Sequence, residues 1–295
     1  MLSLKEVRTR ISSVESTEQI TNAMKMVAAS KLRKAQNSIL KLRPYASKLQ
    51  EILHNLTKSF ENTEINGFSE IETPEKVLLI VIASNRGLCG TFNANIIKAT
   101  NNLIATKYNE QNKAGNLDIY CFGKKASEYY KKNNYKVIAS NNEIFSDLTF
   151  ENTAPVAEIF MKDFTEKKYD IIEIIYDQFK NATVQRLIIE QYLPIVLAKE
   201  ETINEKESFI DFFFEPSKKD IIRELIPKFL KIQLYKALLD SFASEHGARM
   251  TAMHKATDNA RELLKELKLS YNKARQAAIT NEILEIVGGA EALKG

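Results

Sequence analysis

The segment with the most suggestive chemistry is residues 84–91 (SNRGLCGT), which follow an apolar run typical of a strand and precede a stretch typical of a helix. In α/β sheets, ligands bind where a strand ends and a helix begins. The segment nevertheless lacks the GK[ST] ending of a phosphate-binding P-loop and the three-glycine spacing of a dinucleotide site. A structural tight turn, in which glycine relieves backbone strain, is therefore the favoured interpretation.

The cysteines and histidines give no catalytic or metal site by their spacing. Cys89 would need a base beside it to act as a nucleophile, and no histidine lies near it in the sequence. Cys89 and Cys121 fit no metal-ligand spacing, which predicts two buried free thiols. His54, His246 and His254 fall in the two end segments, where packing or surface roles are expected. We therefore predict no catalytic residue, metal or cofactor, and a mechanical or scaffolding protein.

The composition predicts a folded chain that reaches a membrane only through a partner. The 295 residues are 44% hydrophobic and 27% charged, which is enough for one good core or two modest ones. The longest apolar run, residues 77–83, is far too short to cross a bilayer. The first thirty residues carry charges every few positions, unlike a signal peptide.

Positive charge is concentrated at the N-terminal end. The net charge of the chain is only +4, yet residues 1–43 hold nine basic and three acidic side chains. Such a segment favours an acidic partner. A solvated basic helix face is the alternative interpretation, and charge alone does not separate the two.

The N-terminal segment carries a heptad pattern. Apolar side chains recur there at alternating steps of three and four residues, a period of 3.5 that predicts a left-handed coiled-coil seam. The positions are Leu4, Val7, Ile11, Val14, Ala28, Leu32, Ala35, Ile39, Leu42, Ala46, Leu49, Leu53 and Leu56.

Two features interrupt this pattern. Polar residues occupy three successive seam positions from residue 18 to residue 25, while Ile20, Met24 and Val27 lie beside the seam. We expect the apolar stripe to shift round the helix there. Pro44 lacks a backbone donor, which predicts a kink or an end of the helix near Arg43.

The C-terminal segment repeats the heptad pattern over a greater length. Its seam positions are Leu225, Phe229, Ile232, Leu239, Ala243, Met250, Met253, Ala260, Leu264, Leu267, Tyr271, Ala274 and Ala278. Residues 219–287 could form one helix of about 68 residues, roughly 100 Å long. A helix of that length must be covered by another. Intramolecular pairing with the N-terminal segment is the expected solution, because the chain between them keeps their effective concentration high.

The middle of the chain has a different pattern. Short apolar runs typical of buried strands lie at residues 77–83, 117–122, 135–138, 169–176, 183–192 and 209–214, and helical stretches lie at about 93–108, 124–132 and 154–167. This alternation predicts an α/β domain with a mostly parallel sheet and an antiparallel edge at its end. The predicted divisions are residues 1–59, 75–215 and 219–295, with a linker at 60–74.

Four stretches resemble motifs of the ATP synthase gamma subunits. They are residues 20–35 (ITNAMKMVAASKLRKA), 83–95 (ASNRGLCGTFNAN), 244–260 (SEHGARMTAMHKATDNA) and 271–289 (YNKARQAAITNEILEIVGG). They occur in the family's order, and the similarity covers the whole chain. The resemblance implies a long antiparallel coiled coil of the N- and C-terminal helices around a central Rossmann-like α/β domain.

The resemblance also implies a function without chemistry of its own. Gamma subunits form the central stalk of the F1 sector of bacterial F-type ATP synthase. They rotate inside the ring of three alpha and three beta subunits, contact the epsilon subunit and stand on the membrane c-ring. The implied role is to couple proton flow to ATP synthesis at the beta-subunit sites, from the cytoplasmic face of the inner membrane.

The resemblance carries over to particular residues. In the family, the segment that matches residues 24–34 meets acidic levers of the beta subunits, while positions near the C-terminal tip contact the beta subunits or form a hydrophobic bearing. The implied partner interface is Met24, Lys31, Arg33, Lys34, Arg275, Gln276, Thr280, Glu282, Ile283 and Val287.

Two other functions stay open at this point. A nucleic-acid-binding coiled coil would use the basic end segment and exposed aromatic residues, for which Tyr129 and Tyr130 beside Lys131 and Lys132 are the one hint. A small-molecule enzyme would need a pocket with convergent polar groups at residues 84–91.

Overall fold

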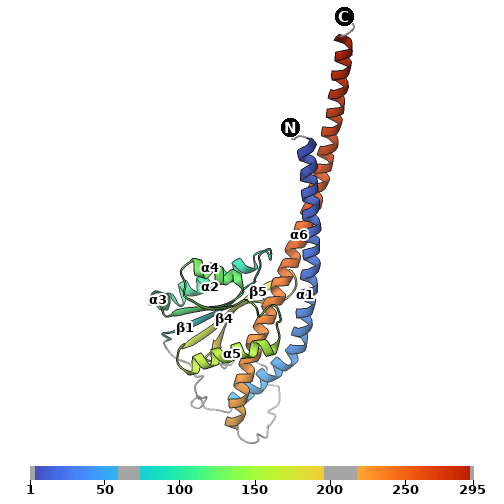
Figure 1. Cartoon of the computed structure of the whole chain (residues 1–295). Coiled ribbons are helices and arrows are strands. Elements are labelled where there is room, and N and C mark those ends of the chain that lie inside the picture. The colour runs from blue at the N-terminus through green and yellow to red at the C-terminus, as the bar shows by residue number, and fades with distance from the viewer. Residues whose placement is uncertain (1–3, 59–73, 196–217, 293–295) are drawn as a thin grey trace. The chain divides into compact units, whose positions relative to one another are not determined.

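A computed structural model describes residues 4–58, 74–195 and 218–292 of the chain (Figure 1). In chain order the elements are α1 (Leu4–Lys58), β1 (Val77–Ile82), α2 (Phe92–Thr106), α3 (Asn109–Lys113), β2 (Leu117–Phe122), α4 (Lys124–Lys132), β3 (Val137–Asn141), α5 (Phe150–Thr165), β4 (Ile171–Phe179), β5 (Gln185–Leu193) and α6 (Lys218–Ala292). The expected strand at 209–214 lies outside the described residues. None of the described helices is both long and apolar enough to cross a membrane.

The chain divides into two compact units. We call residues 30–248 the α/β unit, and residues 1–29 together with 249–295 the helical unit. The long helices α1 and α6 each contribute to both units. The predicted domain boundaries at residues 59, 75, 215 and 219 stay a prediction.

The α/β unit is built on a five-stranded sheet in the order β3-β2-β1-β4-β5. Strand β1 pairs in parallel with both β2 and β4, and β2 pairs in parallel with β3. Strand β5 pairs antiparallel with β4. The predicted mostly parallel sheet with an antiparallel edge is therefore confirmed. Strand β1 is buried along its whole length, as expected of a central strand covered on both faces.

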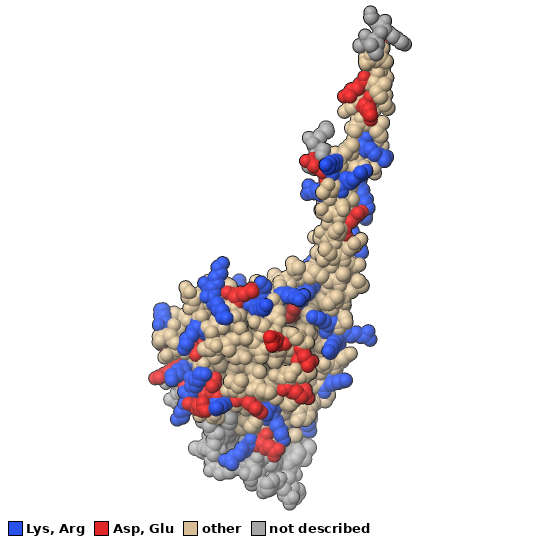
Figure 2. Space-filling model, in the orientation of Figure 1, with Lys and Arg blue, Asp and Glu red and all other residues tan. Residues whose placement is uncertain are grey.

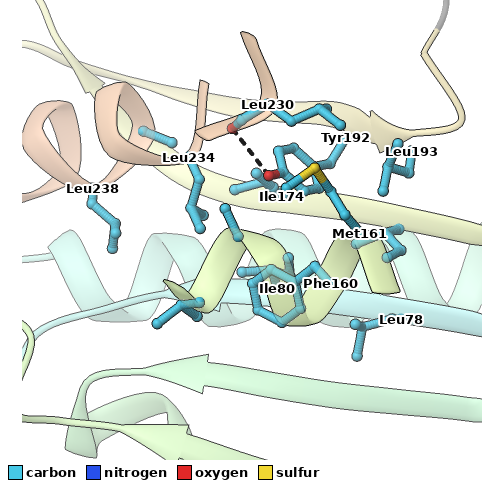
Figure 3. Close-up of a cluster of buried hydrophobic side chains, with 14 of the residues drawn as sticks. Leu78, Ile80, Phe160, Met161, Ile174, Tyr192, Leu193, Leu230, Leu234 and Leu238 are labelled. Carbon is cyan, nitrogen blue, oxygen red and sulfur yellow. Dashed lines mark hydrogen bonds between the residues drawn. The ribbon is translucent and has the colours of Figure 1, made fainter. Parts of the chain in front are cut away.

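Two hydrophobic clusters cover the faces of this sheet. Because successive side chains of a strand point to opposite faces, Leu79 and Val81 of β1 pack in the cluster with α2 and α4, whereas Leu78, Ile80 and Ile82 pack in the cluster with α5 and α6. In Figure 3, leucines of α6 lie over the second cluster, and the hydroxyl of Tyr192 on β5 donates a hydrogen bond of 3.0 Å to the carbonyl of Leu230.

The helical unit is an antiparallel pair formed by the first part of α1 and the last part of α6. Residues that advance along α1 pair with residues that recede along α6, in the order Arg8 with Tyr271, Glu15 with Lys268, Glu18 with Arg261 and Thr21 with Thr257. The expected intramolecular pairing of the two ends is thus confirmed.

The expected shift of the apolar stripe near residue 21 is wrong. Thr21 is buried in the seam, while Ile20 and Val27 are 59% and 58% exposed. The seam keeps its register because its polar groups bind each other: Thr257 Oγ1 donates to Thr21 Oγ1 at 2.9 Å, and Thr21 Oγ1 donates to the Glu18 carbonyl at 3.0 Å. A satisfied hydroxyl can replace an apolar side chain at a seam position.

Of the two outcomes expected at Pro44, the end of the first helix near Arg43 is wrong, whereas the kink stays a prediction. Helix α1 continues through Pro44 to Lys58. Proline removes the hydrogen bond to the carbonyl four residues earlier. Pro44 is exposed on the helix surface, so water can hydrate that carbonyl and the helix need not end.

Candidate functional site

The turn between β1 and α2 is held by hydrogen bonds within itself. The Ser84 backbone N–H donates to Asn93 Oδ1 at 3.0 Å, the Asn93 side-chain amide donates to Ser84 Oγ at 2.8 Å, and Ser84 Oγ donates to the Arg86 carbonyl at 2.7 Å. Leu88 and Gly90 adopt positive φ of 64° and 61°. These polar groups turn inward, which agrees with a structural turn and not with a ligand loop.

Both cysteines are free and buried, as predicted. Cys89 Sγ lies 3.2 Å from the side-chain nitrogen of Asn93, which donates to it. Burial raises the pKa of the Cys121 thiol to about 12, so that thiol stays protonated at neutral pH. Asn93, which ties the whole turn together, was missed by the sequence analysis. In the sequence, Asn93 is an asparagine at the start of a helical stretch, and the chain has many asparagines.

The crevice where doubly wound sheets bind ligands is covered by α6. In such sheets the site lies at the carboxyl ends of neighbouring strands whose connections leave in opposite directions, here β1 and β4. Ser244 Oγ donates to the Asp177 carbonyl near the end of β4 at 2.8 Å, and Ser241 Oγ donates to the Ile82 carbonyl at the end of β1 at 3.4 Å. A helix of the chain itself therefore occupies this edge of the sheet (Figure 1).

Two buried carboxyl groups flank this edge. Burial raises the pKa of Asp177 to about 6, and no other cause contributes. Burial also raises the pKa of Asp240 to about 6, although the positive charges of Lys236 and Arg43 act to lower it and that of Glu190 acts to raise it. Because burial raises both pKa values, the ionised form of each carboxyl group costs stability in the folded chain.

Among the residues whose side chains the structure describes, His246 and His254 belong to no cluster of potential metal ligands, and the side chain of His54 lies outside them. No group of three potential ligands gathers within residues 4–58, 74–195 and 218–292. His246 is buried and its ring lies 4.4 Å from that of Phe242, edge to face, in the expected packing role. His254 lies on the surface with Nδ1 3.3 Å from Asp258 Oδ2, a helical neighbour that the sequence analysis overlooked.

The basic residues of α1 that the resemblance points to lie on the surface of the α/β unit. Lys31, Arg33 and Lys34 are all exposed, while Leu32 between them is buried. Across the described ranges, none of the three makes an ion pair. Met24, in the helical unit, is only half-buried. These cations are thus accessible, and no acidic group among the described residues pairs with them.

The last turns of α6 are exposed on every side. Every side chain from Arg275 to Glu291 is accessible, including Gln276, Thr280 and Glu282. Apolar side chains are prominent among them: Ile279, Ile283, Leu284, Ile286 and Val287 are 49–65% exposed. Exposed apolar groups at this density mark a surface that binds another molecule.

A second set of exposed apolar residues lies on α1 of the helical unit. Ile20, Met26 and Val27 are each 58–60% exposed. Ile20 and Val27 were expected in a shifted seam, so their exposure on the surface was not predicted. Their place outside the strict heptad positions is the signal that identifies them.

The hint of a nucleic-acid site on α4 is not supported. Tyr130 is fully buried, and its ring packs edge to face on those of Tyr129 and Tyr135. The hydroxyl of Tyr129 accepts a hydrogen bond from Asn101. Figure 2 shows lysine and arginine interspersed with aspartate and glutamate over the visible face of the α/β unit. Neither stacking rings nor a single-sign field is present there.

Sequence comparison gives a consistent result over the full chain. A protein-family model described as ATP synthase matches residues 3–293. The chain is 55% identical to the ATP synthase gamma chain of Christiangramia forsetii and 54% identical to that of Flavobacterium johnsoniae. Both similarities cover 100% of this chain and 100% of the relative.

Solved structures share the fold. A chain of the Euglena gracilis mitochondrial ATP synthase OSCP/F1/c-ring structure matches with a TM-score of 0.68 at 20% identity, covering 98% of this chain and 94% of that one. A chain of the Tetrahymena thermophila mitochondrial ATP synthase central stalk/c-ring structure matches with a TM-score of 0.56 at 24% identity, covering 80% and 99%. The predicted combination of paired end helices and an α/β domain is confirmed.

Proposed function

The chain belongs to the ATP synthase gamma-chain family, and from this premise we propose that it is the rotating central stalk of a bacterial F1Fo ATP synthase. Proton flow through a membrane c-ring turns the chain, and its rotation drives the beta-subunit sites through their binding states. ATP hydrolysis at those sites turns it backwards.

The observation that carries this proposal is the exposed end of α6. Beyond Arg275 the helix has no cover from the described residues of this chain, yet it presents Ile283 and Val287 at 54% exposure each. An isolated helix in water does not maintain such a surface without a partner. A ring of surrounding subunits would supply an apolar bearing for it, while Arg275, Gln276, Thr280 and Glu282 would meet the polar parts of the same subunits.

We propose that the chain performs no chemistry. Its potential ligand crevice is covered by α6, and Ser84 and Asn85 of the turn use their polar groups to bind other residues of this chain. The isolated chain is expected to show no ATPase activity and to bind nucleotide no more tightly than about 1 mM. Calorimetry checks this: submillimolar binding that is lost on mutating Gly87 or Gly90 would contradict it.

The proposed partners follow from the surfaces and from the assemblies in which the structural relatives occur. Exposed Lys31, Arg33 and Lys34 suit acidic levers of the beta subunits, and Met24 in the helical unit would also contact the beta subunits. The α/β unit would face an epsilon subunit and the c-ring, as central-stalk chains of the structural relatives accompany a c-ring. The chain would then lie at the cytoplasmic face of the inner membrane, attached only through these partners.

Rotation can be observed directly. We expect a complex of this chain with alpha and beta subunits to turn a bead attached to the α/β unit in one direction when ATP is added. Replacing Ile283 and Val287 together by aspartate should prevent assembly or stall rotation, because charges would enter an apolar bearing. The matched control Glu285→Gln, on the same turns, should leave rotation unchanged. Steady ATP hydrolysis without bead movement would refute the proposal.

A further inference from the structure

Two serines of α6 bind the sheet instead of their own helix. Ser244 is fully buried and donates to the Asp177 carbonyl on β4 at 2.8 Å. Ser241, 2% exposed, makes a longer contact of 3.4 Å with the Ile82 carbonyl on β1. Hydroxyls inside helices commonly bond to the carbonyl one turn back, as Ser38 and Thr100 do here. These two instead connect a helix to the backbone of the two central strands.

One turn further on, Gly247 allows α6 to approach the turn between β4 and β5. A Cβ at this position would lie 3.2 Å from Ala182 Cα, 3.3 Å from the Ala182 carbonyl oxygen and 3.4 Å from Phe179 Cε2. The first two are backbone atoms, which cannot rotate away as a side chain can. Glycine costs about 1 kcal/mol relative to alanine inside a helix, so its presence in α6 needs a local reason. Close packing on Ala182 supplies that reason.

These contacts differ in kind from the leucine packing earlier in α6. Leu230, Leu234 and Leu238 lie on the hydrophobic cluster of the sheet (Figure 3). Apolar contact is non-directional and tolerates small slides of a helix over a surface. A hydrogen bond and a backbone contact fix both the rotation of α6 about its axis and its position along that axis. The apolar contacts therefore stabilise α6 on the sheet, whereas the hydrogen bonds and the backbone contact fix its position.

We propose that Ser241, Ser244 and Gly247, which we call the α6 clamp, are positioning residues that lock α6 to the ends of β1 and β4. This inference rests on the proposed rotor function, and it assigns the path of torque inside the chain. Torque that enters at the α/β unit passes to α6 through the clamp, while the leucine packing supplies stability. The α6 clamp lies at the edge where doubly wound sheets bind a ligand, so α6 occupies the position that a ligand would have.

The first test measures the clamp in the isolated full-length chain. Ser244→Ala leaves the Asp177 carbonyl without its partner, and Gly247→Ala forces α6 away from Ala182. The rate of amide hydrogen exchange in α6 residues 236–248 should rise about fivefold in either variant. Loss of a single neutral hydrogen bond is expected to raise the population of the locally open state by about that factor. Ser38→Ala is the matched control, because that hydroxyl bonds only within its own helix. Unchanged exchange in both variants would overturn the proposal.

The second test measures coupling in reconstituted complexes at equal assembly. Proton-driven ATP synthesis should fall at least threefold relative to ATP hydrolysis in Ser244→Ala, whereas Ser38→Ala should keep the wild-type ratio. A merely structural role would lower assembly or thermal stability and leave this ratio unchanged, which would overturn the proposal. If the wild-type complex itself synthesises ATP without this chain turning, the rotor function fails instead. If Ser244→Ala does not fold, the ratio of ATP synthesis to ATP hydrolysis in Gly247→Ala tests the proposal independently.

Discussion

The two units of this chain differ in the buried polar contacts that join α6 to its neighbours. In the α/β unit, buried side chains such as Ser244 and Tyr192 bond to backbone carbonyls of other elements. In the helical unit, side chain meets side chain across a single seam, as Thr257 meets Thr21 and Arg261 meets Glu18. A backbone acceptor has a fixed position, but a pair of side chains can rearrange together. The polar contacts of the α/β unit therefore hold its elements rigidly, and those of the helical unit set the register of its two helices.

The hydrophobic contacts differ in the same sense. The α/β unit buries side chains on both faces of a sheet, and Ile80, Ile172 and Ile174 have no exposure at all. The seam of the helical unit is one residue wide, and Leu267 and Ala260 each keep 8% exposure. A deep core resists local opening far more than a two-helix seam does. The following predictions test this contrast, beginning with the largest expected effect.

The largest effect is expected in the core of the α/β unit. Ile174→Ala should lower the free energy of unfolding by about 3–5 kcal/mol, because it leaves a cavity that the surrounding sheet and helices cannot fill. Leu267→Ala in the helical unit should cost no more than about 2 kcal/mol, since two helices can close over the lost volume. Urea denaturation followed by tyrosine fluorescence and by far-ultraviolet circular dichroism measures both. Equal losses would abolish the contrast between the units.

A pH-dependent effect of similar size should come from Asp177. Its pKa is raised to about 6 in the folded chain from an ordinary value near 3.8, so the folded state holds the proton more tightly. Stability must therefore fall as pH rises from about 4 to 6. The shift of about two units corresponds to a loss of at most about 3 kcal/mol.

Asp177→Asn removes this ionisation and tests the sign. The difference in unfolding free energy between variant and wild type should increase in favour of the variant from pH 4 to pH 7. Glu262→Gln, on the exposed face of α6, is the control for replacing one carboxylate by an amide at the surface. A difference that increased toward low pH would show that the ionised carboxylate is stabilised in the folded chain.

The polar seam of the helical unit should respond to single and double changes differently. Thr257→Val leaves the buried Thr21 without its cross-helix partner and should cost about 1–3 kcal/mol. Replacing both threonines by valine should restore most of this loss, because neither side chain then lacks a partner. A double-mutant cycle on the full chain gives the coupling energy. Strictly additive losses would mean that the hydroxyl pair does not set the seam.

The sequence predicted this architecture well where one periodic signal dominated. The heptads of the two ends and the β-branched runs of β1 and β2 each pointed to one structure, and β2 begins and ends at the predicted residues. The predictions failed where local chemistry competed with pattern. At Thr21 the hydroxyl is satisfied by a residue more than 200 positions away, and no local signal could reveal that. At Pro44 surface exposure overrode the usual helix-breaking effect.

The candidate site was less predictable than the fold. The turn at residues 84–91 could be recognised as structural from what it lacks, but its key partner Asn93 could not be singled out. The clamp residues Ser241 and Ser244 lie inside a long helical pattern, where serine is simply a weak helix former. Their role depends on the edge of the sheet that they contact. The spacing of residues in the sequence does not show where that edge lies.

The smallest effect on stability is expected from the basic surface of α1. Replacing Lys31, Arg33 and Lys34 together by glutamine should change the unfolding free energy by no more than about 0.5 kcal/mol, because the three side chains are exposed and pair with no described acidic group. Their role would be in association. The rate at which the chain binds a complex of alpha and beta subunits should fall about tenfold at 20 mM salt, and the difference should nearly vanish at 500 mM salt, where screening removes long-range attraction. The control is Lys265→Gln with Lys268→Gln and Lys273→Gln, which removes the same charge from α6. If both triple variants slowed binding equally, net charge alone would steer association. A loss confined to the α1 variant would identify the site that the acidic partner recognises.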